Sequence, residues 1–183
     1  MTKKWVAPPL WREELTGWLA ALKAGGRSEQ TLLTRRRKMT YAAVCLGVSP
    51  YEVTCEMMTT WFASQDWKPE TRKSYRNTVS SFFAWMRQTG RRTDDPSLEL
   101  PKIKRPRPHP RPCPDKVILA ALGRASESER IMLRLGAECG LRRGEIGRVS
   151  SGDVVDDLVG RSLVVNGKGD KQRIVPLRMI WPT

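Results

Sequence analysis

Two short segments of the sequence contain residue types that could bind a phosphate ester and assist a reaction at it. Arg142 lies in the run Gly-Leu-Arg-Arg-Gly-Glu at 140–145, and Lys168 lies in the run Gly-Lys-Gly-Asp at 167–170. A guanidinium is a planar fork of donors that matches the oxygens of a phosphate, and arginine stays protonated throughout. A lysine can give a proton to a departing oxygen. Together these side chains could stabilise the transition state of phosphodiester cleavage.

Each of these residues also has an ordinary structural interpretation. Arg142 could lie at the start of a helix and pair with Glu145, and Lys168 could be a solvated turn residue. A Gly-Leu-Arg turn and a glycine-rich hairpin are both common. The functional hypothesis therefore depends on finding both segments in this order behind a basic N-terminal half.

The charge balance favours an acidic partner. The 183 residues include 33 lysines and arginines against 19 acidic residues, a formal net charge of +14. The excess lies mainly in residues 1–112. Such a field attracts polyanions, and nucleic acid is the first class to consider. The alternative is a basic surface that only keeps the protein in solution.

The sequence gives no support to metal, cofactor or membrane classes. His109 is the only histidine and no C-x-x-C pair exists, so no zinc set of Cys and His can be assembled. No apolar run approaches membrane-spanning length and no secretory signal is visible. These features predict a reduced, cytoplasmic protein with four unpaired cysteines, which are Cys45, Cys55, Cys113 and Cys139.

Four helices are expected before residue 95. Apolar residues recur at helical spacing, with Gly25-Gly26, Gly47 and Gly90 as helix ends and Ser28 as an N-cap. The apolar stripes lie in residues 11–22, 32–46, 57–62 and 75–86. Their aromatic residues are best explained as the core that holds the helices together.

The rest of the chain changes character twice. Residues 96–114 are rich in proline and basic side chains, which predicts a semi-rigid linker that could also follow phosphates. Helices are then expected at 116–124 and 127–139, followed by a sharp turn at Gly140-Leu141 into a further short helix. Two strands are expected at 162–166 and 172–177, around the turn at 167–170.

Taken together, the two segments resemble the first arginine box and the β-hairpin lysine box of the tyrosine recombinases, the phage-integrase family. By position, Arg142 matches the first active-site arginine, Lys168 the hairpin lysine, and Glu145 the acidic residue that supports the arginine. In that family a tyrosine attacks a DNA phosphodiester and forms a 3′-phosphotyrosyl bond, with no metal or nucleotide cofactor. The resemblance therefore implies double-stranded DNA as a partner, together with other recombinase protomers on that DNA.

The resemblance covers nearly the whole chain and implies a mainly α fold. Residues 8–95 would be a four-helix, SAM-like core-binding domain and residues 96–114 the linker. Residues 115–183 would be the first part of an α+β catalytic domain with a small β-hairpin. The intact parent would carry out DNA integration and recombination in a bacterial or phage-infected cell.

The resemblance also implies a DNA-binding face on the second and fourth helices, which enter neighbouring stretches of major groove in the family. Arg37 and Lys38 are expected opposite the apolar stripe, and Asn77 and Ser80 on the face away from Tyr75. Arginines and Asn77 could read base edges while the lysines hold phosphates. A merely solvated face is the alternative. The implied residues are Arg35, Arg36, Arg37 and Lys38 in the second helix and Lys73, Arg76, Asn77 and Ser80 in the fourth.

One departure from the family pattern limits the expected activity. The family's His-x-x-Arg box and nucleophilic tyrosine have no counterpart, because His109 precedes Arg142 and the last tyrosine is Tyr75. We therefore expect a truncated catalytic domain that cannot cleave DNA by itself and is more mobile or adhesive than residues 1–95. A non-enzymatic regulator that occupies recombination sites and an unrelated RNA-binding protein are the two other hypotheses.

Overall fold

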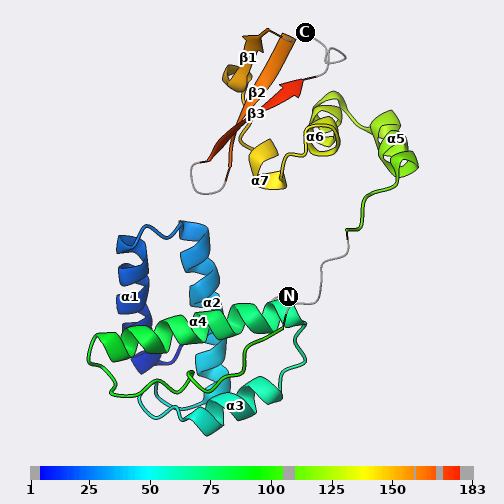
Figure 1. The fold of residues 1–183 in the computed structure, drawn as a ribbon. Helices are drawn as coiled ribbons and strands as arrows, with labels where there is room; N and C mark the ends of the chain where they lie inside the picture. The colour runs from blue at the N-terminus through cyan, green and yellow to red at the C-terminus, as the bar shows by residue number, and fades with distance from the viewer. Residues whose placement is uncertain (1–4, 105–109, 159, 168–170, 178–183) are drawn as a thin grey trace. The chain divides into compact units, whose positions relative to one another are not determined.

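The computed structural model describes residues 5–104, 110–158, 160–167 and 171–177. The chain divides into two compact units, Met1–Pro108 and His109–Thr183. The first unit is helical, and the second combines helices with a small antiparallel sheet (Figure 1). This mainly α architecture with a small sheet confirms the predicted fold class.

The described part of the first unit contains four helices, as predicted. They are α1 (Pro9–Ala24), α2 (Glu29–Leu46), α3 (Cys55–Ala63) and α4 (Pro69–Gln88). Figure 1 shows α1 and α2 side by side, with α4 running across them. The start of α4 carries a proline, whose fixed φ suits the first helical turn.

The core of the first unit is aromatic. Trp11 and Trp18 of α1 are fully buried against Phe82 and Phe83 of α4. The rings of Trp11 and Phe82 stack at a centroid distance of 5.5 Å, and Trp18 meets Phe82 edge-on at 5.4 Å. Each buried aromatic side chain stabilises the fold by about 1.5–3 kcal/mol. These stripes are therefore helix-packing residues, as the sequence predicts.

Both ends of α2 lie where the sequence predicts them, at Ser28 and Gly47. Gly47 ends the helix in the left-handed conformation, with φ of 71°. Ser28 occupies the N-cap position, but its hydroxyl contacts Thr31 Oγ1 at 2.9 Å and makes no hydrogen bond to the helix backbone. Ser28 is therefore the N-cap residue, as predicted, but its side chain caps no backbone N–H of the helix.

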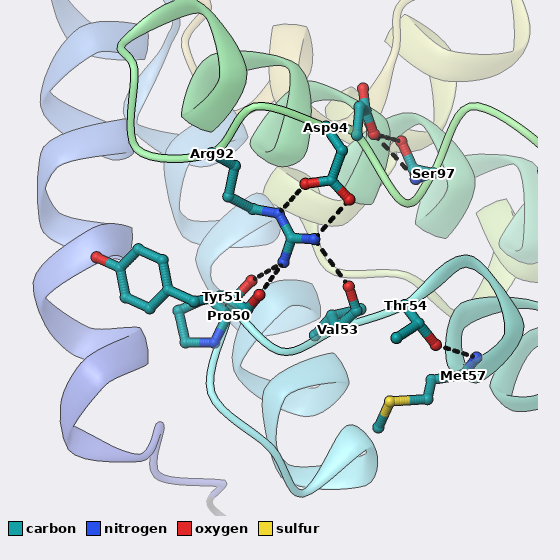
Figure 2. Close-up of polar contacts among 9 residues, drawn as sticks. Pro50, Tyr51, Val53, Thr54, Met57, Arg92, Asp94 and Ser97 are labelled. Atoms are coloured by element: carbon teal, nitrogen blue, oxygen red, sulfur yellow. Dashed lines mark hydrogen bonds and ion pairs between the residues drawn. The ribbon is translucent and has the colours of Figure 1, made fainter.

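Arg92 ties the segment after α4 to the α2–α3 connection, as Figure 2 shows. Its guanidinium donates to the carbonyl oxygens of Pro50, Tyr51 and Val53 at 2.7, 2.7 and 3.0 Å. It also forms a two-pronged pair with Asp94 at 2.9 and 2.8 Å. These bonds satisfy carbonyls that no helix or strand reaches.

The start of the segment predicted as a linker packs on the helical unit. Pro96, Ser97 and Leu100 are buried, and Leu100 belongs to the aromatic core. Arg76 of α4 donates to the carbonyl oxygen of Leu100 through Nε at 3.1 Å and Nη2 at 3.0 Å. The hydrophobic effect holds this stretch against the helices despite its prolines.

The second unit begins with helices and ends in the sheet. Its helices are α5 (Asp115–Arg124), α6 (Glu127–Ala137) and α7 (Arg143–Ile146), followed by a 3-10 turn, η1 (Ser151–Asp153). The strands are β1 (Val154–Asp157), β2 (Gly160–Asn166) and β3 (Gln172–Leu177), in the order β1-β2-β3. Both strand pairings are antiparallel.

The core of the second unit is much smaller. Leu135, Leu141, Leu163 and Val165 are its buried apolar residues, drawn from α6, the turn before α7, and β2. No residue of α5 is buried. None of the described helices is long and apolar enough to cross a membrane.

Candidate phosphate-binding site and candidate DNA-binding helices

Arg142 and Glu145 lie at the start of α7. Arg142 is the N-cap residue, and its backbone N–H donates to Glu145 Oε2 at 2.9 Å. Its Nη1 donates to Glu145 Oε1, also at 2.9 Å. The Arg142 side chain is 75% exposed, whereas that of Glu145 is 3% exposed. A buried carboxylate therefore anchors one edge of an arginine that otherwise faces solvent.

A third residue, Arg173 of β3, completes this cluster. Its Nη1 and Nη2 donate to Glu145 Oε1 and Oε2 at 3.2 and 2.8 Å. Arg173 pairs with Val165 across the strands and lies on the same face of β3 as the half-buried Val175 and Leu177. Sequence reasoning assigned Arg173 no role, although a cation on the apolar side of an expected strand is a signal that it has a buried partner.

The electrostatics of the cluster follow from this geometry. Hydrogen bonds from Arg173, and then from the backbone N–H of Arg142, hold the pKa of Glu145 well below its usual range. Glu145 in turn raises the pKa of Arg173. One carboxylate and two guanidinium groups leave a net charge of +1, and the exposed Arg142 can present that charge to an anion.

Lys168 lies outside the described residues, but Gly167 after β2 and Lys171 before β3 are described. The backbone N–H of Gly167 donates to the carbonyl oxygen of Lys171 at 2.8 Å. A Cβ atom on Gly167 would lie 3.6 Å from Glu145 Oε1 and 3.7 Å from Arg173 Nη1. The ends of β2 and β3 thus meet at the cluster around Glu145.

On α2, the four predicted DNA-binding residues lie in two different settings. Arg36 and Arg37 are exposed. Arg35 is half-buried 5.8 Å from the centroid of the Trp18 ring, and its Nη1 has no hydrogen-bond partner. Burial, and then the charge of Arg27, lowers the pKa of Arg35.

The prediction that Lys38 lies opposite the apolar stripe is wrong. Lys38 is half-buried, donates to Ser74 Oγ and lies 5.4 Å from the centroid of the Tyr75 ring. Because α4 packs on this side of α2, Lys38 faces the neighbouring helix. Burial, and then the charge of Arg35, lowers its pKa.

On α4, the predicted residues also divide. Asn77 is exposed, and Lys73 and Ser80 are half-buried. Arg76 is bound to the carbonyl oxygen of Leu100, so two of its donors serve the fold. Among the described residues, no group of three or more His, Cys, Asp or Glu side chains is arranged to hold a metal ion.

Comparison with known proteins gives consistent relatives, although no family model matches the chain. Tyrosine recombinase XerC of Chromobacterium violaceum is 28% identical over 175 residues, covering 90% of this chain and 58% of that protein. Tyrosine recombinase XerD of Xanthomonas campestris is 31% identical over 123 residues, covering 64% of this chain and 38% of that protein. A lambda integrase dimer bound to a core site has a similar fold, with a TM-score of 0.72 at 20% identity, covering 90% of this chain and 61% of the other.

The curated relatives and the fold similarity all indicate the tyrosine recombinase and integrase family. The chain spans 58% and 38% of the lengths of the two curated relatives. The fold similarity extends across both units, because 90% of the chain is covered.

Proposed function

We propose that this chain is the DNA-binding part of a site-specific tyrosine recombinase. Its first unit would contact duplex DNA through α2 and α4, and Arg142 with Lys168 would hold the phosphodiester that the intact enzyme cleaves. Other recombinase protomers on the same DNA would be its partners, by likeness to the lambda integrase dimer on a core site.

The observation that carries this proposal is the cluster around Glu145. An exposed Arg142 is anchored at one edge by a buried carboxylate, which leaves its remaining donors free for phosphate oxygens. Gly167, the residue before Lys168, lies against the same carboxylate. Electrostatic stabilisation of phosphoryl oxygens needs such fixed cations.

The setting of α2 supports the DNA-binding half of the proposal. Burial lowers the pKa of both Arg35 and Lys38. A neighbouring cation lowers it further, Arg27 for Arg35 and Arg35 for Lys38. Such unneutralised cations gain most from an anionic neighbour. Arg36 and Arg37 extend this positive surface into solvent, where the negative backbone of DNA would meet it.

The three tyrosines have settings that do not suit an attacking phenolate. The Tyr51 hydroxyl donates to Glu14 Oε1 at 2.6 Å, and this bond raises its pKa. A hydrogen bond with Cys45 and burial raise the pKa of Tyr41 to about 12, and burial raises that of Tyr75. An attacking phenolate is favoured by the opposite shift, a lowered pKa. We infer that these 183 residues bind DNA without cleaving it.

The test of DNA binding is the salt dependence of duplex affinity for the chain and two double variants. Arg36→Ala with Arg37→Ala should reduce the slope of log affinity against log salt by about two, because each phosphate contact contributes roughly 0.9. Lys116→Ala with Arg124→Ala removes the same charge from exposed positions of α5 and should leave the slope nearly unchanged. Equal losses in both double variants would contradict the proposed face.

Cleavage is tested separately with a nicked duplex. The chain should form no covalent adduct that survives denaturation, even when duplex binding is saturated. A covalent protein–DNA species that disappears in one of the variants Tyr41→Phe, Tyr51→Phe or Tyr75→Phe would overturn the inference and identify the nucleophile.

A further inference from the structure

The contacts of Glu145 show how the two arginines share one carboxylate. Arg173 uses both of its terminal nitrogens, one on each oxygen. Arg142 reaches the carboxylate with one terminal nitrogen and with its backbone N–H. Because Arg173 occupies both oxygens, Arg142 makes a single side-chain contact and keeps most of its guanidinium in solvent.

The charges lead to the same division of roles. A pair of Arg142 and Glu145 alone would be neutral and would offer little attraction to a phosphodiester. The guanidinium of Arg173, with its side chain 37% exposed, adds the second positive charge beside a carboxylate that is 3% exposed. The buried negative charge is thereby balanced without Arg142.

We propose that Arg173 is a positioning residue for the phosphate site: it occupies and neutralises Glu145 so that Arg142 stays extended and positively charged towards the phosphodiester. This inference rests on the proposed function for what Arg142 binds, but not for the arrangement itself. Arg173 acts through Glu145 and need not touch the DNA.

The ion pair of Arg173 with Glu145 also connects two elements of the second unit. Arg173 belongs to β3, whereas Arg142 and Glu145 lie at the start of α7. Gly167 directly follows β2, and a Cβ atom added there would lie 3.7 Å from Arg173 Nη1. The ion pair therefore joins the strands that flank Lys168 to the turn that carries Arg142.

The first experiment needs no ligand. Side-chain resonances of Arg142 are recorded by NMR in the full chain, in Arg173→Leu and in Arg173→Lys. Arg161→Leu is the matched control, because Arg161 lies on the adjacent strand and its nearest acidic partner, Asp156, is exposed.

In Arg173→Leu, Arg142 should donate to both oxygens of Glu145. Its guanidinium signals should therefore shift, and rotation about its Nε–Cζ bond should slow. Arg173→Lys keeps the charge but donates from one nitrogen, so Arg142 should move less than in Arg173→Leu. This variant also guards against a loss of fold in Arg173→Leu. Arg142 signals that move no more in Arg173→Leu than in Arg161→Leu would overturn the inference.

The second experiment measures affinity for a mixed-sequence duplex over a range of salt concentrations. Arg142→Ala should reduce the salt slope by about one in the original chain and leave it unchanged in the Arg173→Leu background. An equal reduction in both backgrounds would refute the positioning role. If the original chain bound no duplex at all, the proposed function would fail, and the NMR result would still decide the role of Arg173.

Discussion

Individual basic residues in this protein serve two different purposes. Arg72 and Arg92 donate to backbone carbonyls and hold the first unit together. Arg36 and Arg37 are exposed and remain available to a ligand. A net charge of +14 therefore overstates the charge that is available to an anionic ligand, because part of it is engaged with the fold.

Glu145 provides a pH-dependent prediction at the residue scale. Its pKa in the folded chain lies below the ordinary value of about 4.3, so its contacts stabilise the second unit above that pH. This stability should be lost as the pH falls from about 4.3 through the folded pKa. Glu145→Gln should be less stable at neutral pH and should show a weaker acid dependence in this range.

The measurement is urea denaturation of the second unit between neutral and strongly acidic pH, followed by amide signals of β2 and β3. Glu138→Gln is a suitable control, because its carboxylate is partly exposed and 3.8 Å from Arg134. Curves for the chain and Glu145→Gln that stay parallel at every pH would show that Glu145 is not linked to folding.

Element boundaries depend on single backbone conformations, and the C-terminal end of α2 is the clearest case. Gly47 has φ of 71°, and no atom lies within 4 Å of a Cβ added there. Gly47→Ala should therefore destabilise the first unit by about 1 kcal/mol through backbone strain alone. Gly25 ends α1 with φ of −78°, so Gly25→Ala should be neutral or slightly stabilising.

Tryptophan fluorescence during urea denaturation measures both effects, because Trp11 and Trp18 are buried in the core of the first unit. A loss of stability in Gly25→Ala as large as that in Gly47→Ala would mean that the general flexibility of glycine, and not its left-handed backbone conformation, matters at these helix ends.

The molecule as a whole has two units with unequal cores. The first is built around buried aromatic residues from α1 and α4, and the second around four buried aliphatic residues. Exposed apolar side chains on α5 and α6 include Val117, Leu119 and Met132. Apolar burial provides most of the stability of a fold, so the first unit should be the more stable of the two.

Native-state hydrogen exchange checks this expectation. Amides of α1, α2 and α4 should be protected longest, and those of α5 should exchange first, because α5 has no buried residue. Equal protection across α2 and α5 would contradict the inequality of the two cores. The α6 amides near Leu135 are an internal control, since that residue is buried in the second core.

Most elements of the fold were predictable from local patterns. Helical spacing of apolar residues predicts α1 through α4, and turn residues predict where α2 ends and where β2 and β3 pair. These features depend on residues close together in the sequence. The strand β1 was missed, because the four residues Val154–Asp157 are all exposed and lack alternation. It becomes a strand only by pairing with β2.

The sequence alone therefore determined the helices, the strands β2 and β3, the basic character and the pair Arg142 and Glu145, since all of these follow from composition or short spacing. Only the tertiary structure decided that Lys38 packs against α4, that Arg76 binds a backbone carbonyl, and that Arg173 shares Glu145 with Arg142. Long-range packing brings these groups together, and no local pattern specifies which side chains will meet across it.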